Sequence, residues 1–464
     1  MRNLILNTDS YKHSHFLQYP PELKYNSAYI EPRFDNHKGV IYVPSRVMSY
    51  GLQMFLKEYL SKPITMENIY EAEQFLAVHG EPFNKEGWMR IFNKHGGYLP
   101  LEIEAIPEGT IHDMRVPQVQ VTNTDPELPW LTSFIETALL RSIWYPSSVA
   151  TISWRIKQIA KTFMEITADD PENKLAFVLN DFGARGATSH ESASIAGSAH
   201  LINFMGTDTI EGILAARRYY NADMAGFSIP AMEHSTVTSW GINREKEAYE
   251  NMLDKCGGPG KMIAAVSDSY DLFKAVDKYW GKELKDKVIA SGGRVVIRPD
   301  SGDATMIPVE VCEKLGQSYG FTVNSKGYKV LNDSVRVIQG DGMKELTIAK
   351  LFENLRHNGW SVENVAIGMG GQLLQGVNRD TFGYAMKTNA VDYGNGWEDV
   401  QKNPKTDPNK KSKAGRQSVH VLNGKLVAQK RVDKDVKHDM LQPVWRNGEL
   451  LKEWSFDQIR QNAS

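Results

Sequence analysis

Six short apolar runs recur through the middle of the chain, and each ends in a cluster of polar or glycine residues. Within residues 294–303, the β-branched run 295–297 stops at Arg298, Pro299 and Asp300. A continuous apolar run of this length is typical of a buried strand in a parallel sheet, and the proline, which has no N–H to donate, marks its end. The other five runs begin at Leu175, Phe227, Met262, Val335 and Val365.

The segments between the runs favour helices. Residues 189–204, 269–284 and 343–358 carry apolar residues at helical spacing, and strands that alternate with helices build a parallel sheet. Successive runs lie roughly 30–50 residues apart, close to the unit length of a (β/α) barrel with insertions. The sequence therefore predicts an α/β fold with a central (β/α) barrel-like domain, whose polar strand ends meet at one rim.

The polar strand ends have two readings. Strands commonly end in turns, and turn chemistry alone accounts for the glycines and many of the aspartates and serines. It does not account for a cation and a carboxylate together at Arg298 and Asp300, or for Glu233 and His234 at another strand end. We therefore favour a binding site at this rim.

Both ends of the chain show a different pattern. Leu101, Ile103 and Ala105 alternate with charged residues, as in antiparallel strands. Asn-Gly pairs at 423–424 and 447–448 stand between alternating apolar residues and predict two hairpins. We therefore expect an α+β domain built from both chain ends, residues 1–148 and 388–464, packed with a barrel domain of residues 149–387.

Composition narrows the class of function. With 54 basic and 56 acidic residues, the chain has no charge excess that would attract nucleic acid or an anionic membrane. Two cysteines in 464 residues argue against a disulfide framework and suit a reducing compartment. No apolar run reaches membrane-spanning length, and the N-terminal residues turn polar too early for a signal peptide. A cytoplasmic protein with neither nucleic acid nor membrane as a partner is expected.

Several strand-end groups suit phosphate. Gly368-Met-Gly-Gly is a glycine turn that opens a helix, where free N–H groups bind phosphate, although a plain strand–helix turn explains it equally well. It is not a P-loop, because no Gly-Lys-Ser/Thr follows. Arg185, Arg298 and Arg379 are expected to neutralise a second, pyrophosphate-sized charge.

Other strand-end residues suit a sugar, a metal-bound substrate and a flat ring. Asp341, which follows Gly340, is placed to hold a ribose diol, as acidic residues do in nucleotide-binding folds. Asp268 and Asp300 are expected to orient a magnesium-bound substrate through water, with no direct protein ligand to the metal, because magnesium usually keeps several waters. Phe182 directly follows a strand, and it either stacks on a flat ligand or caps the core.

His234 stands directly after Glu233. A lone histidine is more often structural than catalytic, but the neighbouring carboxylate, which can fix the tautomer of the imidazole, favours a functional role. No Ser-His-Asp or Cys-His signature and no metal spacing of two histidines accompanies it, so neither hydrolysis nor zinc chemistry is indicated. Together the strand-end residues suit transfer of a phosphoribosyl group to a planar nitrogen base.

From residues 8–12 to residues 455–460, the chain resembles the nicotinamide phosphoribosyltransferase family. The motifs that carry the resemblance are Gly206-Thr-Asp-Thr, Glu233-His-Ser-Thr, Val266-Ser-Asp-Ser-Tyr-Asp, Ile297-Arg-Pro-Asp-Ser-Gly and Val337-Ile-Gln-Gly-Asp-Gly. The resemblance implies a homodimer of the type II phosphoribosyltransferase fold, with its site at the subunit interface. It also implies that nicotinamide and phosphoribosyl pyrophosphate, with magnesium, give nicotinamide mononucleotide and pyrophosphate in NAD biosynthesis, driven by ATP through a phosphorylated histidine.

The resemblance assigns roles to individual residues. Phe182 and Tyr11 of the partner subunit would enclose the nicotinamide ring, and Asp208 would accept a hydrogen bond from the carboxamide. His234 would be the phosphorylated histidine. The remaining assignments are Arg185, Arg298 and the partner's Arg33 at pyrophosphate, Asp300 and Asp341 along the ribose, and Gly370, Gly371 and Arg379 at the 5′-phosphate. Tyr11, Arg33 and Asp208 are singled out by the resemblance alone.

The chain departs from the family at three positions, and alternatives to its function stay open. Relatives have histidine at Asn180, an aromatic residue at Ala184 and serine at Ala385, which implies a wider ring pocket at 184 and looser phosphate contacts at 385. The nearest alternative is a nicotinate or other planar-base phosphoribosyltransferase, which Asp208 disfavours because a carboxylate repels a carboxylate. A non-catalytic nucleotide-binding or signalling protein of the same fold is the alternative of a different class, and the intact strand-end residues argue against it.

Overall fold

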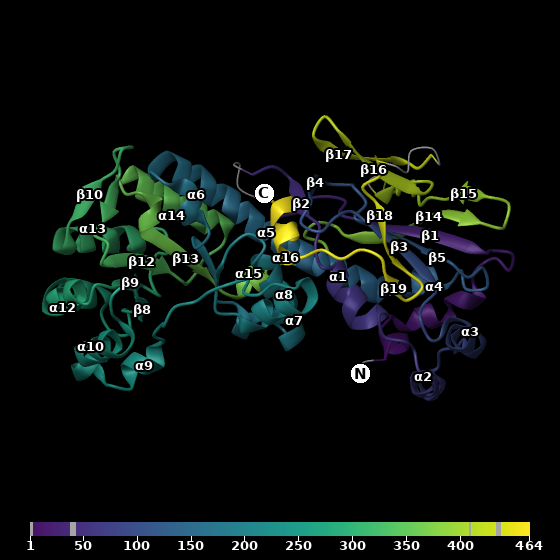
Figure 1. The fold of residues 1–464 in the computed structure, drawn as a ribbon, viewed down its shortest axis with the longest axis horizontal. Coiled ribbons are helices and arrows are strands. Elements are labelled where there is room, and N and C mark those ends of the chain that lie inside the picture. Colours follow the sequence, from purple (N-terminus) through teal and green to yellow (C-terminus); the bar gives the residue numbers. More distant parts are fainter. Residues whose placement is uncertain (1–2, 38–42, 408–409, 433–437) are drawn as a thin grey trace.

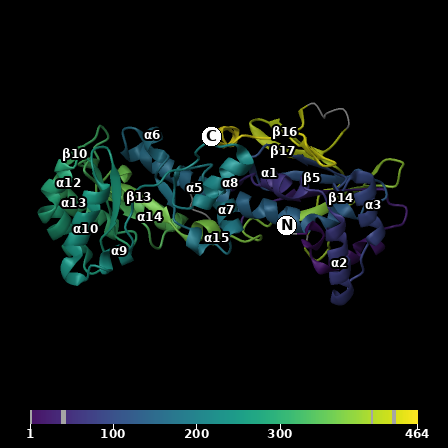
Figure 2. The same ribbon diagram turned by 60° about the horizontal axis from the view of Figure 1, so that its bottom comes forward.

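The computed structural model describes residues 3–37, 43–407, 410–432 and 438–464. Its elements form two regions, a parallel sheet surrounded by helices and an antiparallel sheet built from both chain ends (Figure 1). The long helix α5 (Glu136–Thr167) runs between the regions in this view and in the turned view (Figure 2). It packs against α7 (His190–His200) and α14 (Glu345–His357) on one side and β2 (Arg46–Met48) on the other.

Six parallel strands form the sheet of the first region. In spatial order they are β7 (Gly206–Thr207), β6 (Leu179–Asp181), β13 (Val365–Met369), β12 (Val335–Gln339), β9 (Arg294–Arg298) and β8 (Met262–Val266). The segment 227–232 joins the two edges, because Phe227 bridges to Gly206 and Ala231 to Ala264. Thr207 N donates to Phe227 O at 3.0 Å and Met232 N to Ala264 O at 2.9 Å. The sheet therefore closes into a ring in which each strand lies beside the next along the chain, as in a (β/α) barrel.

The predicted barrel is confirmed, with corrections to its strands. Leu175 ends the short helix α6 (Pro171–Leu175), and β6 begins only at Leu179, because the proline opens a helical turn and Val178 N bonds back to Leu175 O at 3.2 Å. The run at Phe227 forms isolated bridges instead of a regular strand. Strand β7, which has only two residues, gives no sequence pattern and was not predicted.

Helices surround the barrel at the expected places. The predicted helices are confirmed by α7, by α11 (Leu272–Lys274) with its continuation η6 (Ala275–Glu283), and by α14. The other helices of this region are α8 (Ile210–Tyr220), α9 (His234–Thr238), α10 (Glu245–Cys256), α12 (Lys285–Ala290), α13 (Ile307–Tyr319) and α15 (Gly371–Gln375). A small hairpin of β10 (Phe321–Val323) and β11 (Lys329–Leu331) follows α13.

Alternate residues of the strands fill the barrel. Ala264, Val296 and Ile338 form a small buried cluster, against which Phe182, Ile229 and Ala366 pack. Their neighbours on the same strands, including Ile263, Val295 and Val337, belong instead to the main core shared with the helices. Because successive side chains of a strand point to opposite faces, the small cluster is the interior layer of the barrel.

The second region contains a seven-stranded sheet. Its strands, in spatial order, are β15 (Trp397–Asp399), β14 (Ala385–Asp392), β1 (Tyr25–Glu31), β5 (Val119–Asn123), β3 (Leu101–Ala105), β18 (Gln442–Arg446) and β19 (Glu449–Leu450). Among the other elements from the chain ends, α4 (Leu131–Phe134) packs on β1 and β5. The rest are η2 (Ser10–Leu17), α1 (Leu52–Phe55), η3 (Leu56–Leu60), α2 (Met66–His79), α3 (Lys85–His95), β4 (Ile111–Asp113) and α16 (Phe456–Asn462). The expected α+β region built from both ends is confirmed.

Both Asn-Gly hairpins are confirmed. Asn423 and Gly424 have φ of 51° and 73° between β16 (Gln417–Leu422) and β17 (Lys425–Lys430). Asn447 and Gly448 have φ of 53° and 97° between β18 and β19. Two consecutive positive φ angles are what the tight hairpin turn requires, and Asn-Gly adopts them with the least strain.

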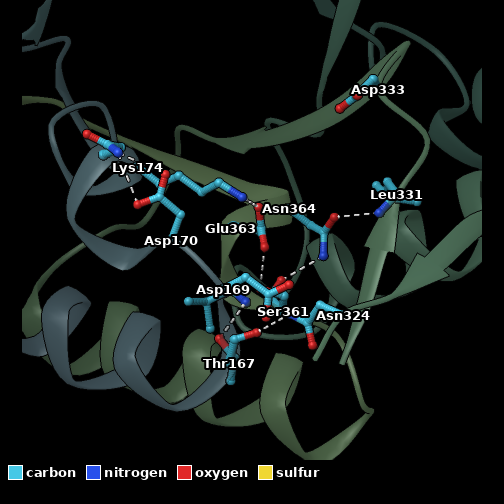
Figure 3. Close-up of polar contacts among 12 residues, drawn as sticks. Thr167, Asp169, Asp170, Lys174, Asn324, Leu331, Asp333, Ser361, Glu363 and Asn364 are labelled. Atoms are coloured by element: carbon cyan, nitrogen blue, oxygen red, sulfur yellow. Dashed lines mark hydrogen bonds and ion pairs between the residues drawn. The ribbon is translucent and has the colours of Figure 1, made fainter. Parts of the chain in front are cut away.

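Polar contacts link neighbouring segments at the amino-terminal end of the barrel (Figure 3). Lys174 pairs with Glu363, Leu331 N donates to Asn364 Oδ1 at 2.8 Å, and Asn324 Nδ2 donates to Thr167 O at 2.7 Å. These contacts join the end of α5 to the loops that precede β12 and β13.

The predicted domain boundaries do not coincide with the ends of helices or strands. The predicted boundaries at 148/149 and 387/388 fall inside α5 and β14, and the division into three segments stays a prediction. Among the described residues, no helix has both the length and the apolar character to cross a membrane.

Candidate active site

Side chains from the ends of two strands, β6 and β9, meet around Gly340 at the end of a third, β12. A Cβ atom added to this glycine would lie 3.1 Å from Asp300 Oδ1, 3.6 Å from the ring of Phe182 and 3.7 Å from Arg298 Cδ. On Gly368 it would lie only 2.0 Å from the same ring, so no larger residue fits beneath Phe182. The structure thus brings together, at the carboxyl end of the barrel, a flat ring, a cation and a carboxylate predicted from separate parts of the sequence.

Arg298 has hydrogen-bonding capacity left for a ligand. Its Nη2 lies 3.6 Å from Asp300 Oδ2, with 17% and 25% of the two side chains exposed. Its buried Nε has no hydrogen-bond partner among the described residues. A buried N–H group without an acceptor costs free energy until an acceptor binds it. A guanidinium is well suited to an anion with several oxygens. The position therefore fits a phosphate or pyrophosphate group.

The glycine turn at 370–371 packs against the loop that follows Phe182. A Cβ on Gly183 would lie 2.9 Å from Gly370 O, and one on Gly186 would lie 2.9 Å from Gly371 Cα. Gly371 is the first residue of α15, and exposed Arg185 lies within the facing turn η4 (Ala184–Gly186). Close backbone approach of the two loops puts Arg185 beside the N-terminus of α15, where anions are favoured.

Asp208 is held from two sides. Its backbone N donates to Asp181 O at 2.8 Å, and Ser228 Oγ donates to its side chain from the segment that closes the barrel. Asp208 itself is exposed at the rim, directly after β7. The barrel closure therefore also fixes the carboxylate that the resemblance assigns to the carboxamide.

Asp181 lies beneath this part of the rim and was not predicted. Its side chain is fully buried, and burial raises its pKa to about 6, although the N–H of Gly183 donates to Oδ1 at 2.7 Å and favours the charged form. The negative charges of Asp208 and Glu211 raise the pKa further. The sequence hinted at Asp181, because this carboxylate stands between the apolar run that begins at Leu175 and the aromatic Phe182.

His234 pairs with Asp268 and not with Glu233, which corrects the sequence expectation. His234 Nε2 lies 2.9 Å from Asp268 Oδ1, and 46% of the imidazole but only 6% of the carboxylate is exposed. Glu233 accepts instead from Ser235 Oγ. The partner comes from the next strand end, after β8, because strand ends that are distant in sequence meet at the rim whereas adjacent side chains of an extended segment diverge.

Asp341 and the three positions that differ from the family lie in separate places. Asp341 is exposed in the loop after β12, where its backbone oxygen accepts from Gln339 Nε2 at 3.0 Å. Asn180 donates to Phe177 O and Ile367 O, both at 3.2 Å. Ala184 is half-buried in η4, and Ala385 is buried opposite Glu31 in the antiparallel sheet.

Tyr11 and Arg33 do not belong to the rim of their own chain. Tyr11 is 57% exposed on η2, whose Lys12 pairs with Glu136 at 2.7 Å. Arg33 follows β1, and its Nε donates to Gly383 O at 2.8 Å. Both therefore lie on the antiparallel region, away from the strand ends that carry Phe182 and Asp300.

Arg379 groups with Arg33 in a basic patch. Burial lowers the pKa of Lys387, Glu136 opposes this, and the positive charges of Arg33, Lys402 and Arg379 lower it further. We call Arg33, Arg379, Lys387 and Lys402 the basic patch. Lys387 was not predicted, because in β14 it reads as an ordinary polar residue of an alternating strand. Such a cluster of cations suits a polyphosphate anion.

A cavity of about 720 Å³ lies beside the rim. Its lining includes Asn7, Tyr59, Trp144, His190 and Arg218, together with Gln375 at the end of α15. It includes none of Phe182, Arg298, Asp300 or His234. The strand-end cluster is therefore an open rim of the barrel, separate from this cavity.

Comparison with known proteins gives matches over most of the chain. Residues 177–449 match the model of the nicotinate phosphoribosyltransferase family, and residues 3–103 match the N-terminal domain of nicotinamide phosphoribosyltransferase. A nicotinamide phosphoribosyltransferase of Xanthomonas campestris is 47% identical, over 99% of this chain and 98% of its own. One of Acinetobacter baylyi is 29% identical, over 98% and 96%.

Two solved structures share the fold. A nicotinate-nucleotide pyrophosphorylase of Pyrococcus furiosus has a TM-score of 0.63 at 17% identity, with 99% of this chain and 95% of that chain covered. The human nicotinic acid phosphoribosyltransferase has a TM-score of 0.57 at 18% identity, with 98% and 92% covered. At this identity the likeness concerns the fold, which is that of the type II phosphoribosyltransferases.

The raised pKa of Asp181 predicts how stability depends on pH. The folded chain holds this proton more tightly than the unfolded chain, so the contribution of Asp181 to stability falls as pH rises from the ordinary value of 3.8 to about 6. Asp181→Asn removes this titration. The free energy of unfolding of the variant, relative to the original chain, should rise by on the order of 3 kcal/mol between pH 3.5 and 7. Urea denaturation across this range measures it, and a difference that stays flat with pH would contradict the assignment.

Proposed function

The chain belongs to the nicotinate phosphoribosyltransferase family, and we propose that it transfers the phosphoribosyl group of phosphoribosyl pyrophosphate to nicotinamide. The observation that carries the proposal is the meeting of Phe182, Arg298 and Asp300 around Gly340. The ring offers a platform for a planar base, the arginine an anion site and the aspartate an acceptor for sugar hydroxyls. The products, nicotinamide mononucleotide and pyrophosphate, place the reaction in NAD biosynthesis or salvage.

The reaction requires little covalent chemistry from the protein. The bond between C1′ of the ribose and the pyrophosphate oxygen breaks, and the ring nitrogen of nicotinamide bonds to C1′. Positive charge develops on the ribose and negative charge on the leaving pyrophosphate. Arg298 and Arg185 stabilise the leaving group, Asp300 and Asp341 orient the ribose, and the turn at Gly370 and Gly371 holds the 5′-phosphate.

We propose that a second copy of the chain completes the site. Tyr11 and the basic patch lie on the antiparallel region of their own chain, and Lys387 of the patch is close enough to feel the charge of Glu136, which pairs with Lys12 beside Tyr11. The antiparallel region of the chain therefore offers an exposed ring at Tyr11 and exposed cations at Arg379 and Lys402, with Arg33 and Lys387 half-buried. In a homodimer this region would meet the partner's rim. There Tyr11 would lie across the base from Phe182, and a phosphate would bind the buried Nε of Arg298, which has no hydrogen-bond partner among the described residues.

Magnesium fits the same site as a companion of the substrate. When bound, the ion would neutralise pyrophosphate oxygens and weaken the bond to the leaving group. Among the described residues, no group of three or more His, Cys, Asp or Glu side chains is arranged to hold a metal. The carboxylates of Asp268 and Asp300 stand at neighbouring strand ends, where they would orient waters of a substrate-bound ion.

Nicotinamide is favoured over nicotinate by Asp208. This exposed carboxylate, fixed by Ser228 and by Asp181 O, accepts from a carboxamide but repels a carboxylate. A nicotinate phosphoribosyltransferase is the second candidate, because the family model that residues 177–449 match is named for that activity. A cytoplasmic location is proposed on the two free cysteines, Cys256 and Cys312.

Asp208→Asn tests the choice of base. The variant loses a charge-assisted hydrogen bond to nicotinamide and the repulsion of nicotinate, so the ratio of kcat/KM for the two bases should move toward nicotinate by about 1.5–3 kcal/mol. Release of pyrophosphate with nicotinamide, nicotinate or no base is the measurement. Asp223→Asn, a change of an exposed aspartate in the loop after α8, serves as the control. An unchanged ratio, or an original chain that prefers nicotinate, would contradict the proposal.

We further propose that His234 takes a phosphoryl group from ATP. If Nε2–H donates to Asp268 Oδ1, then Nδ1 carries the lone pair that attacks the γ-phosphorus, the bond from that phosphorus to ADP breaks, and Nδ1 is left phosphorylated. The imidazole is 46% exposed and so accessible to a nucleotide. The added negative charge beside Asp268 would favour magnesium and the positively charged ribosyl centre, which links ATP to product formation.

His234→Ala separates this role from a structural one. The variant should lose ATP hydrolysis and the stimulation of synthesis by ATP, while slow ATP-independent synthesis and the melting temperature stay nearly unchanged. His357→Ala, a similarly exposed histidine at the end of α14, is the control. A variant that still hydrolyses ATP and still responds to it would show that His234 is not the phosphorylated group.

A further inference from the structure

A buried ion network joins the two regions of the chain. Arg155, on α5, is 2% exposed, and its Nη1 lies 3.0 Å from Asp35 Oδ2 while its Nε lies 3.1 Å from Glu345 Oε1. The second oxygen of Glu345 pairs with His37 Nε2. Only 5% of Glu345 and 13% of Asp35 are exposed. One buried guanidinium thus lies between two carboxylates from segments that are distant in sequence. It donates a hydrogen bond to Asp35, whereas its contact with Glu345 is an ion pair without hydrogen-bond geometry.

One end of the network is the segment that carries Arg33. We call residues 33–37 the arm. Besides Asp35 and His37, its backbone is fixed where Arg33 N donates to Phe382 O at 3.0 Å and Asn36 N donates to Thr381 O at 2.9 Å. The arm therefore also sets the position of the neighbouring segment that carries Arg379, and through both segments it supports the basic patch.

The other end of the network is the loop that carries Asp341. We call residues 340–344 the ribose loop. Glu345 directly follows this loop as the first residue of α14. Within the loop, Met343 is buried, whereas Asp341 and Gly342 are exposed. Glu345 is therefore the ionic anchor at the carboxyl end of the ribose loop.

The energetic cost of burying these charges indicates that the network fixes the positions of the arm and the ribose loop. Taking charges out of water costs several kcal/mol, and apolar residues of similar volume often give equal or greater stability, whereas removing one partner of a buried pair is strongly destabilising. Arg155 is paired on both sides only when the arm and the ribose loop are in place together. Displacing either segment leaves buried charge without its partner, so each segment favours one position of the other.

From this geometry we propose that Arg155, Asp35 and Glu345 couple the arm to the ribose loop. The proposal rests on the proposed function, in which the ribose loop serves the chain's own site and the arm serves the partner's site. The network then connects the two active sites of a dimer through each protomer. Phosphoribosyl pyrophosphate bound in the site of one protomer would order the arm of the other protomer. Through Arg155, that arm would then order the ribose loop of its own protomer, which belongs to the second site.

Hybrid dimers with a single working site test the coupling. One protomer, the barrel donor, carries Tyr11→Ala and keeps its rim, and its partner, the arm donor, carries Asp300→Ala and keeps its arm. Only the site made of the first protomer's rim and the second protomer's arm is intact. The arm of the barrel donor serves the dead site and touches nothing in the working one.

Asp35→Asn is then added to the barrel donor. Coupling predicts that kcat/KM for phosphoribosyl pyrophosphate at the working site falls about tenfold, as is usual when a residue that orients a ligand group is lost. The KM for this substrate should rise while the KM for nicotinamide stays the same. Reciprocally, Glu345→Gln in the arm donor should produce a similar loss. Asp113→Asn, which removes another Arg–Asp pair of 3.1 Å outside the network, should have no effect on either KM.

Each outcome decides between the proposals. If the parental hybrid shows no activity after verified subunit exchange, the shared site is wrong and the coupling falls with it. In a second outcome, the parental hybrid is active while Asp35→Asn in the barrel donor leaves its activity unchanged; this result overturns the coupling alone. A loss caused by Asp35→Asn in the arm donor does not rescue the coupling, because that arm serves the working site directly. If Asp113→Asn lowers activity and melting temperature as much as Asp35→Asn, the effect is a loss of stability and the positioning role is overturned.

Discussion

Closure of the parallel sheet is the constraint on which the rest of the structure depends. The segment 227–232 pairs with both edge strands, at Gly206 and at Ala264. Without it the sheet would stay open, and β7 would lie on the opposite edge from β8. With it, Asp208 after β7, His234 after the segment and Asp268 after β8 stand at neighbouring positions of one rim. The same segment supplies Ser228, which fixes the Asp208 carboxylate.

The sequence predicted what local pattern determines. Strands β8, β9, β12 and β13 are built on short apolar runs, which Arg336 interrupts in β12. The Asn-Gly turns require φ angles that few other residues adopt readily. Strand β7 could not be seen, because two residues show no periodicity. The assignment of Tyr11 and Arg33 to the site is a prediction from the resemblance alone, because nothing in their local sequence distinguishes them from surface residues.

Contacts between strand ends were the main source of error. Sequence adjacency suggested that Glu233 holds the imidazole of His234, whereas Asp268, thirty-four residues away, does so. A similar limit applies to Lys387 and to Asp181, whose environments are set by elements far along the chain. Residue types at strand ends therefore predict which chemistry gathers at the rim, while the pairing among them depends on the order of strands in the closed barrel.

The most direct test of the account compares two arginines at opposite ends of β9. Arg298 stands at the rim, where its Nε has no hydrogen-bond partner among the described residues. Arg294 stands at the amino-terminal end, where it donates to Asp333 at 2.8 and 3.1 Å. The account predicts that Arg298→Gln weakens binding of phosphoribosyl pyrophosphate, measured by calorimetric titration with magnesium, by at least about tenfold, since a charge-assisted contact is lost. Arg294→Gln should bind it as the original chain does. Equal affinities for all three proteins, or equal losses in both variants, would contradict the assignment of the substrate to this rim.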